Sequence, residues 1–128
     1  MVSQSTNKVN IMTKAIVTRE SLQALLDSED REKVMHTVGR ALVVLFNNQT
    51  RDEQSSNTTN KDNGIGFTGA DAHSGSITAK TYIKRKALED WQIERWTRPA
   101  ASGFSRLTKY HKQLNTAALE KRARRLDK

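Results

Sequence analysis

The apolar side chains between residues 34 and 46 recur at the spacing of one helical face. They follow an i, i+1, i+4, i+7, i+8, i+11 pattern, which places them on one side of an α-helix. This face consists of Val34, Met35, Val38, Ala41, Leu42 and Leu45. Acidic residues at 27–30 complement the positive end of a helix dipole. The pattern therefore predicts a helix over about 29–48 as the hydrophobic spine. No run of strand length alternates between apolar and polar residues, so we expect an all-α fold.

Shorter helices on either side complete an expected architecture of four to five helices. Thr18 is placed to cap a helix that runs through Leu26, because a threonine hydroxyl can accept a hydrogen bond from the first helical turn. Pro99 interrupts the C-terminal part, because proline cannot continue a helix. Further helices are predicted at 74–86, at 88–97 and from about 104 to 125.

The chain has 128 residues, enough for one domain with one core. We expect residues 17–48 to form a helical hairpin that joins residues 71–128 in this domain, after a disordered segment at 1–16. Residues 47–63 contain essentially no apolar side chain to offset the entropy of ordering. This composition predicts a flexible polar and glycine-rich loop over 49–70. An alternative is that the preceding helix continues over 50–54 before the loop begins.

The chain contains no cysteine, which excludes disulfides, thiolate metal sites and a cysteine nucleophile. Residues 1–10 are polar and lack the apolar segment of a signal peptide. The longest aliphatic run, 41–46, is too short to span a bilayer. These features predict an intracellular protein without a membrane partner.

Residues 64–69 match the G-x-G-x-x-G fingerprint of dinucleotide-binding proteins. That fingerprint functions only between a buried strand and a helix, and a polar stretch precedes it here. We therefore interpret the glycines as residues that permit positive φ. Phe67 is expected to turn inward as a loop anchor, and Asp71 to cap the following helix.

The residues that usually carry catalysis or bind metal occur without the spacing that these functions need. His36, His73 and His111 do not lie three or four residues from one another, which argues against a metal site. The serines lie in neither a G-x-S-x-G nor an S-x-x-K motif. We predict a non-enzyme with no catalytic residues, metal or cofactor.

Positive charge is concentrated in the C-terminal part of the chain. Residues 79–128 carry 14 Lys and Arg against 5 Asp and Glu, whereas residues 1–78 carry 8 against 9. The C-terminal part thus has a net charge of +9 and the N-terminal part of −1, which agrees with the total of +8. Such a one-sided field favours a polyanionic partner, of which nucleic acid is the commonest.

The last predicted helix has an apolar face and an opposite basic arc. Leu107, Tyr110 and Leu114 fall on the first, while Gln113 and Thr116 lie beside the second and offer directional hydrogen bonds. Further basic clusters precede this helix. The predicted nucleic-acid-binding residues are Lys84, Arg85, Lys86, Arg95, Arg98, Arg106, Lys109, Lys112, Lys121, Arg122, Arg124 and Arg125.

Trp91 and Trp96 are five residues apart, so on a helix they point in widely different directions. Core packing of both is the favoured interpretation. The alternative is that a partly exposed Trp96, together with Phe67, anchors a partner or stacks on bases.

Three segments resemble small uncharacterised proteins of tailed bacteriophages. These segments are D-N-G-I-G-F-T-G-A-D-A at 62–72, L-E-D-W-Q at 88–92 and K-Y-H-K-Q-L at 109–114. The N-G-x-G-F-x-x-x-D-A and K-Y-x-x-Q-L elements are also similar to segments of phage helicase-like and DNA-processing proteins. The resemblance implies a phage setting, a cytoplasmic location in the bacterial host cell, and a link to DNA metabolism or host takeover. It transfers no catalytic residue.

Two functional hypotheses follow. The first is a nucleic-acid-binding accessory protein that contacts phosphates through its basic C-terminal helix, with DNA favoured over RNA. The second is a protein-interaction module that inhibits or redirects a host defence, nuclease or polymerase complex. A homo-oligomer joined through the apolar 34–46 helix is a third alternative.

Overall fold

The computed structural model of the chain describes residues 15–56 and 65–126, and these residues form an all-α fold, as predicted. The elements are α2 (Arg19–Leu26), α3 (Arg31–Ser56), α4 (Ala72–Arg85), α5 (Asp90–Thr97), the 3-10 helix η1 (Arg106–Tyr110) and α6 (His111–Leu126). The one β-type pairing in these residues is an isolated bridge between Pro99 and Ser105. None of the described helices is both long and apolar enough to cross a membrane.

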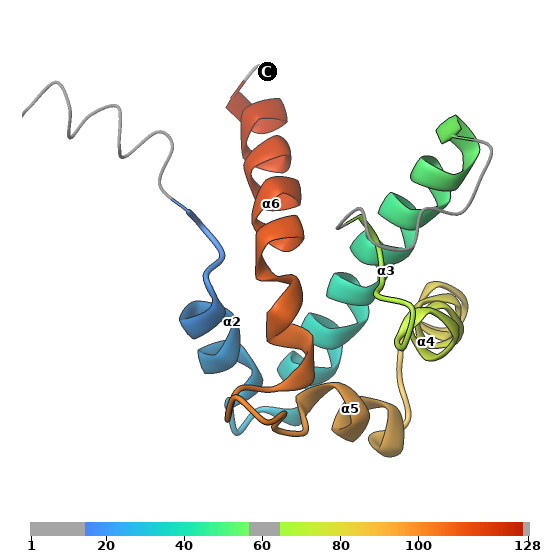
Figure 1. Cartoon of the computed structure of the whole chain (residues 1–128). Helices are drawn as coiled ribbons and strands as arrows, with labels where there is room; N and C mark the ends of the chain where they lie inside the picture. Colours follow the sequence, from blue (N-terminus) through green and yellow to red (C-terminus); the bar gives the residue numbers. More distant parts are fainter. Residues whose placement is uncertain (1–14, 57–64, 127–128) are drawn as a thin grey trace, which may run out of the picture.

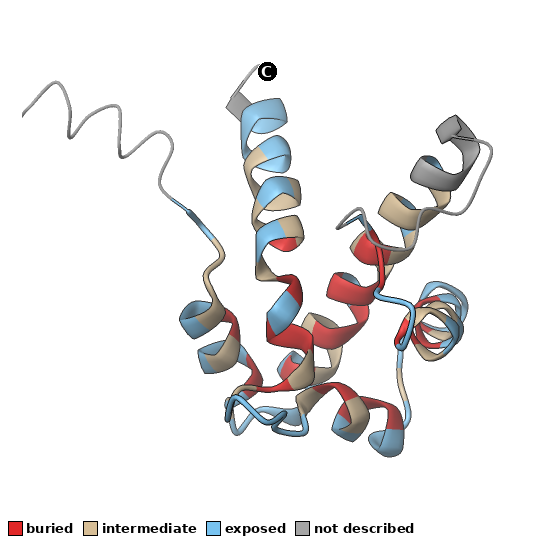
Figure 2. Cartoon of the chain, in the orientation of Figure 1, coloured by how far each residue is buried: buried red, intermediate tan, exposed pale blue. Residues whose placement is uncertain are grey.

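Helix α3 is the spine of the molecule, since α2, α4, α5 and α6 all pack against it. Figure 1 shows α3 and α6 rising from a common base and diverging, with α2 beside the lower end of α6 and α4, seen nearly end-on, beside α3. The buried residues gather at this base, where α3, α5 and η1 meet (Figure 2). The outer ends of α3 and α6 extend beyond the core.

The apolar face predicted from the sequence supplies the centre of that core. Val38, Leu42 and Leu45 are fully buried, together with Trp96 and Leu107. Burying one such side chain stabilises the fold by about 1.5–3 kcal/mol. The face that raised the hypothesis of a homo-oligomer is thus largely covered by the chain's own helices.

Two helical features agree with the prediction in detail. The Thr18 hydroxyl accepts a hydrogen bond from the Ser21 N–H at 3.0 Å, and the Ser21 hydroxyl accepts one from the Thr18 N–H at 2.8 Å, so α2 begins with a complete capping box. The buried face of the last helix also contains Leu107, Tyr110 and Leu114 as expected. However, this helix starts as the 3-10 segment η1, so its first turn is tighter than an α-helix.

The predicted loop over 49–70 differs from the structure at its N-terminal end, whereas its described C-terminal end, 65–70, is non-helical as expected. Helix α3 continues through Ser56, and residues 57–64 lie outside the described part of the chain. At the start of the α3 extension, the Gln49 side-chain oxygen accepts a hydrogen bond from the Phe67 N–H at 3.1 Å. Such contacts stabilise a helix turn that has little apolar surface to bury.

In the segment that precedes α4, the backbone of Gly66 is held in a special conformation by two hydrogen bonds. Its φ is 76°, a left-handed conformation that favours glycine, and a Cβ there would overlap Gln49. The Gln113 side chain accepts from the Gly66 N–H at 2.8 Å and donates to its carbonyl at 2.9 Å. Phe67 is only 5% exposed, so the prediction that its side chain turns inward is confirmed.

The disordered segment predicted at 1–16 lies mostly outside the described residues. Its last residue is held in place, because the N–H groups of Ile16 and Val17 both donate to the Asn115 side-chain oxygen, at 2.6 and 2.9 Å. This contact ties the entry of α2 to the middle of α6.

Candidate nucleic-acid interface

A fully buried carboxylate organises the start of the basic region. Asp71 occupies the N-cap position of α4, yet its side chain makes no capping hydrogen bond, so the prediction of a side-chain cap was wrong. Instead, Oδ1 accepts from Arg106 Nε at 2.9 Å and Nη2 at 2.5 Å, while Oδ2 accepts from the Tyr110 hydroxyl at 2.5 Å and Lys109 Nζ at 2.7 Å. We call these four residues the Asp71 cluster.

The cluster fixes the ionisation of its members. Burial by itself would raise the pKa of Asp71, but hydrogen bonds from Lys109, Tyr110 and Arg106 outweigh burial and hold the pKa below the ordinary value of 3.8. Burial, and then the hydrogen bond to Asp71, raise the pKa of Tyr110 to about 12. At neutral pH, Asp71 is therefore an anion and Tyr110 a neutral donor, and the buried charge is compensated.

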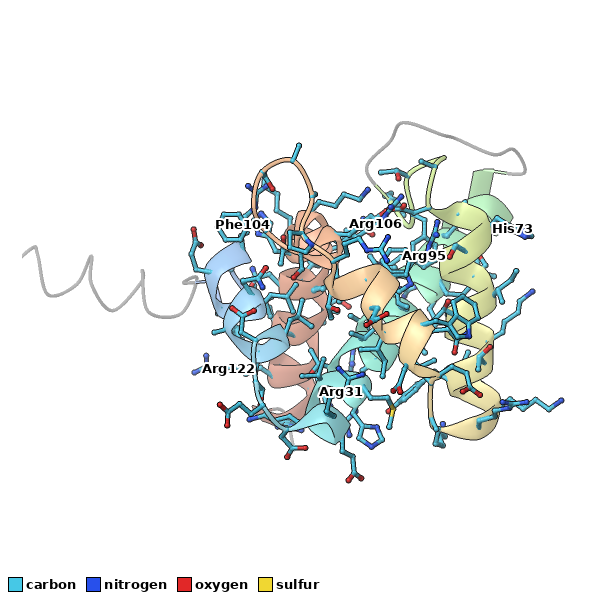
Figure 3. All side chains as sticks on the ribbon, turned by 90° about the horizontal axis from the view of Figure 1, so that it is seen from below. Arg31, His73, Arg95, Phe104, Arg106 and Arg122 are labelled. Atoms are coloured by element: carbon cyan, nitrogen blue, oxygen red, sulfur yellow. The ribbon has the colours of Figure 1, made fainter. Side chains whose placement is uncertain are left out.

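A pocket of about 230 Å³ lies beside this cluster, between α2, α5, the turn after α5 and η1. No carboxylate is among its described lining residues. Figure 3 shows Arg95 and Arg106 close to one another on the segments that form one wall. We call this feature the cationic pocket, after the five basic residues that line it: Arg19, Arg95, Arg98, Arg106 and Lys109.

The five cations differ in how they are held. The guanidinium of Arg106 lies 5.9 Å from the centre of the Trp96 ring, in addition to its contact with Asp71, and that of Arg19 lies 5.3 Å from the Phe104 ring. Arg95 has a buried Nε with no hydrogen-bond partner among the described residues. The pocket thus combines two cations fixed by a carboxylate with three that have no carboxylate partner in the described structure.

The structure brings together four of the predicted nucleic-acid-binding residues, Arg95, Arg98, Arg106 and Lys109. Lys112 lies on α6 and lines a neighbouring pocket that shares Arg19. The remaining predicted residues are exposed and lie elsewhere. They are Lys84 and Arg85 at the end of α4 with Lys86 just after it, and Lys121, Arg122, Arg124 and Arg125 in the second half of α6.

Arg19 was not predicted, because it belongs to the part of the sequence with a net negative charge. The sequence nevertheless contained one indication that Arg19 has a special role. A cation in the first turn of a helix is unfavourable next to the positive end of the helix dipole, and Arg19 is the first residue of α2. Its position is explained by the Phe104 ring that it covers and by the pocket that it lines.

The aromatic anchors proposed from the sequence are corrected by the structure. Trp96 is fully buried and Phe67 nearly so, with ring centres 6.1 Å apart, and neither side chain can reach a partner. Trp91 is the exposed tryptophan instead, at 62%. The five-residue spacing showed that the side chains of Trp91 and Trp96 point in different directions, but not which of the two faces the core. Gln113 is likewise occupied, since its amide binds Gly66.

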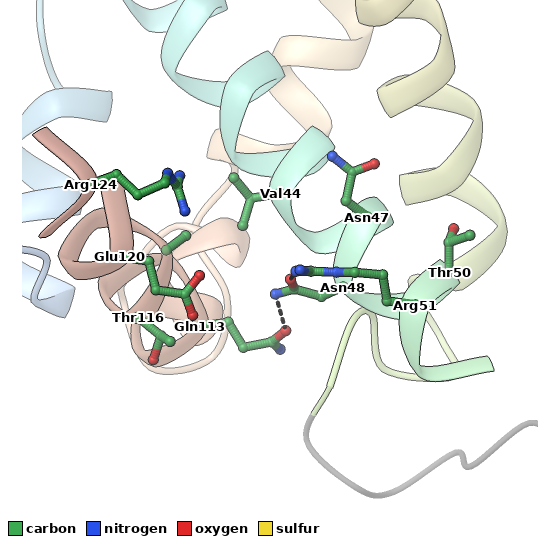
Figure 4. A pocket seen from close by; sticks show the side chains of 10 residues that line it. Val44, Asn47, Asn48, Thr50, Arg51, Gln113, Thr116, Glu120 and Arg124 are labelled. Atoms are coloured by element: carbon green, nitrogen blue, oxygen red, sulfur yellow. Dashed lines mark hydrogen bonds between the residues drawn. The ribbon is translucent and has the colours of Figure 1, made fainter. Parts of the chain in front are cut away.

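A second hollow, of about 450 Å³, lies between the diverging parts of α3 and α6 (Figure 4). Asn48 Nδ2 donates to Gln113 Oε1 across it at 3.2 Å. Its charged lining residues are Arg51, Glu120 and Arg124. Because both signs of charge are present, this hollow is a weaker candidate for a polyanion than the cationic pocket.

Comparison of the chain with protein-family models, with curated proteins and with solved structures finds no match. In the described residues, no group of three or more His, Asp or Glu side chains is placed to hold a metal ion. The resemblance to phage proteins stays a prediction.

Proposed function

We propose that this chain is a small, non-catalytic protein that binds nucleic acid by contacting phosphates through the cationic pocket and the basic surface around it. The observation that carries the proposal is the convergence of five cations from three separate segments on one pocket without an acidic lining residue. Side chains of like charge repel each other, so such a gathering is favourable mainly when an anionic partner is bound.

The residue types suit phosphate oxygens. Four of the five pocket cations are arginines, whose planar guanidinium groups can donate two parallel hydrogen bonds to a phosphate. Asp71 holds Arg106 and Lys109 in place before a ligand arrives, which lowers the entropy lost on binding. The exposed cations at the end of α4 and along α6 would add long-range attraction and raise the rate of encounter.

The proposal is tested by anisotropy of labelled single- and double-stranded DNA, and of RNA, over a salt series. The double variant Arg95→Ala/Arg98→Ala removes two pocket cations and leaves the Asp71 cluster untouched. We expect it to weaken binding and to flatten the salt dependence by about 0.9 in log–log slope for each duplex phosphate that is no longer neutralised. A matched control, Lys33→Ala/Arg40→Ala, removes the same charge from exposed positions on α3.

If the control variant weakens binding as much as the pocket variant, net charge rather than the pocket governs the affinity. Negligible binding of every nucleic acid near physiological salt would contradict the proposal itself. DNA is expected to bind more tightly than RNA, and the same titrations compare the two.

The second candidate function is a protein-interaction module that inhibits or redirects a host complex. The observation that favours it is the exposure of Trp91 on α5, because exposed tryptophans are enriched among the residues that dominate protein interfaces. In this case, the basic surface would dock in an acidic groove that DNA normally occupies. A chain that binds no nucleic acid but captures a host protein, and loses it on Trp91→Ala, would support this candidate.

A further inference from the structure

We infer that the cationic pocket holds a single phosphate monoester, and that its natural source is the terminal phosphate of a nucleic-acid strand. The monoester chemistry follows from the pocket itself. The assignment to a strand end rests on the proposed function.

The charge of the pocket matches a dianion better than a backbone diester. Five cations line it, and among the described residues the single carboxylate in contact with them is Asp71, which leaves four positive charges without a compensating anion in this part of the chain. A phosphate monoester carries about −1.5 to −2 near neutral pH, whereas a backbone diester carries one charge. The same cations therefore attract a phosphate monoester more strongly than a backbone diester.

The donors of the pocket are available to phosphate oxygens. Arg106 uses Nε and Nη2 for Asp71, so its Nη1 hydrogens remain, and Lys109 has three ammonium hydrogens of which one faces Asp71. The buried Nε of Arg95 has no partner in the described chain. Because this Nε is buried, a ligand oxygen in the pocket would contact Arg95 through the Nη groups of its guanidinium.

Two hydroxyl groups of the wall already donate to backbone carbonyls. The Ser105 hydroxyl donates to the Thr97 carbonyl at 2.8 Å, and the Thr108 hydroxyl donates to the Ser105 carbonyl at 2.7 Å. Recognition thus falls mainly to guanidinium and ammonium groups, which donate hydrogen bonds to phosphate oxygens. The pocket should consequently favour a phosphorylated end of any sequence.

The turn that closes the pocket is held by backbone contacts. The Ala100 N–H donates to the Phe104 carbonyl at 2.8 Å, and the Arg106 N–H donates to the Arg98 carbonyl at 3.0 Å. Gly103 supplies the reversal with a φ of 88°. A concave site with such a wall admits a strand end more readily than the middle of a continuous backbone.

The test compares one labelled single-stranded oligonucleotide in its 5′-phosphate and 5′-hydroxyl forms, both by direct titration. A hydroxyl-ended oligonucleotide one nucleotide longer corrects for the added charge. We expect the 5′-phosphate to bind about tenfold more tightly than either control oligonucleotide. Arg95→Ala should abolish this preference, while the Lys33→Ala/Arg40→Ala protein should retain it.

Arg98→Ala provides the same test from an exposed position on the pocket rim, in case Arg95→Ala lowers the melting temperature. Equal binding of the phosphate and hydroxyl forms, with a steep salt dependence, would overturn this inference and leave the proposed function standing. A preference that persists in both variants would also overturn it. If no oligonucleotide binds but adenosine 5′-monophosphate binds and is lost in Arg95→Ala, the monoester site stands and the proposed function fails.

Discussion

Two groups of cations in this molecule have opposite surroundings, although both come from the same basic C-terminal stretch. In the Asp71 cluster, Arg106 and Lys109 share a fully buried carboxylate and keep only 35% and 41% of their side-chain surface exposed. In the basic end of α6, by which we mean Lys121, Arg122, Arg124 and Arg125, every residue is exposed. A single run of positive charge thus contains one group that joins helices and another that faces solvent.

The difference separates stability from binding. Charges that share a buried partner are costly to disturb, because removing one side leaves the other without compensation. Exposed charges contribute little to stability and act chiefly on charged ligands at a distance. Mutation of the first group should therefore alter the free energy of unfolding, and mutation of the second should alter the rate of association with a charged ligand.

The largest effect is expected for Asp71→Ala. This change removes the acceptor of four hydrogen bonds that connect the start of α4 to η1, and it leaves Arg106 and Lys109 without their shared anion. We expect the free energy of unfolding to fall by about 3 kcal/mol. Urea denaturation followed by circular dichroism measures it.

The control is Asp90→Ala, which breaks the exposed ion pair with Arg31 at 3.2 Å. Its cost should stay below about 1 kcal/mol, since both partners face solvent. Equal losses for the two variants would show that the Asp71 cluster has no special structural role.

A smaller effect is expected from pH, through the same cluster. Asp71 has a lowered pKa in the folded state, so its stabilisation is present above its ordinary pKa of 3.8 and is lost as the pH falls through the lowered value. Tyr110 has a pKa raised to about 12, so its stabilisation is present below pH 10 and is lost as the pH rises towards 12. The alkaline loss corresponds to roughly 2–3 kcal/mol.

Tyr110→Phe isolates the alkaline limb, because it removes the hydroxyl that donates to Asp71. The variant should be less stable at neutral pH and should lose less additional stability between pH 10 and 12. Tyr82→Phe removes a different tyrosine hydroxyl, which contacts His36 at 2.7 Å and not Asp71. If both variants show the wild-type alkaline limb, Tyr110 is not its source.

The sequence was sufficient to predict the helices, because each is specified locally. The apolar spacing between residues 34 and 46 identified the side of α3 that faces the core, and Thr18 marked the start of α2. The end of α3 could not be predicted, since its last turns contain polar residues such as Gln49, which binds a distant backbone group at Phe67.

The site was predicted only in part for the same reason. Charge counting selected Arg106 and Lys109 as cations, but their partner Asp71 lies 35 residues before Arg106 in the chain and looked like a local cap. Helical periodicity states which residues share a face and does not state what covers that face. Gln113 was assigned to the surface and a partly exposed Trp96 was kept as an alternative on this basis, but Trp96 is buried and Gln113 binds the distant Gly66.

The smallest effect on stability is expected at the basic end of α6, and this prediction sharpens the contrast with the Asp71 cluster. Replacing its four cations with alanine should change the free energy of unfolding by only about 0.5 kcal/mol. Because these charges attract nucleic acid from a distance, the variant should lower the association rate and flatten its salt dependence. The preference for a 5′-phosphate should persist, since the cationic pocket is intact. Stopped-flow association with both forms of the oligonucleotide measures the two effects together. A loss of the preference would mean that the end of α6, rather than the pocket, contacts the strand terminus.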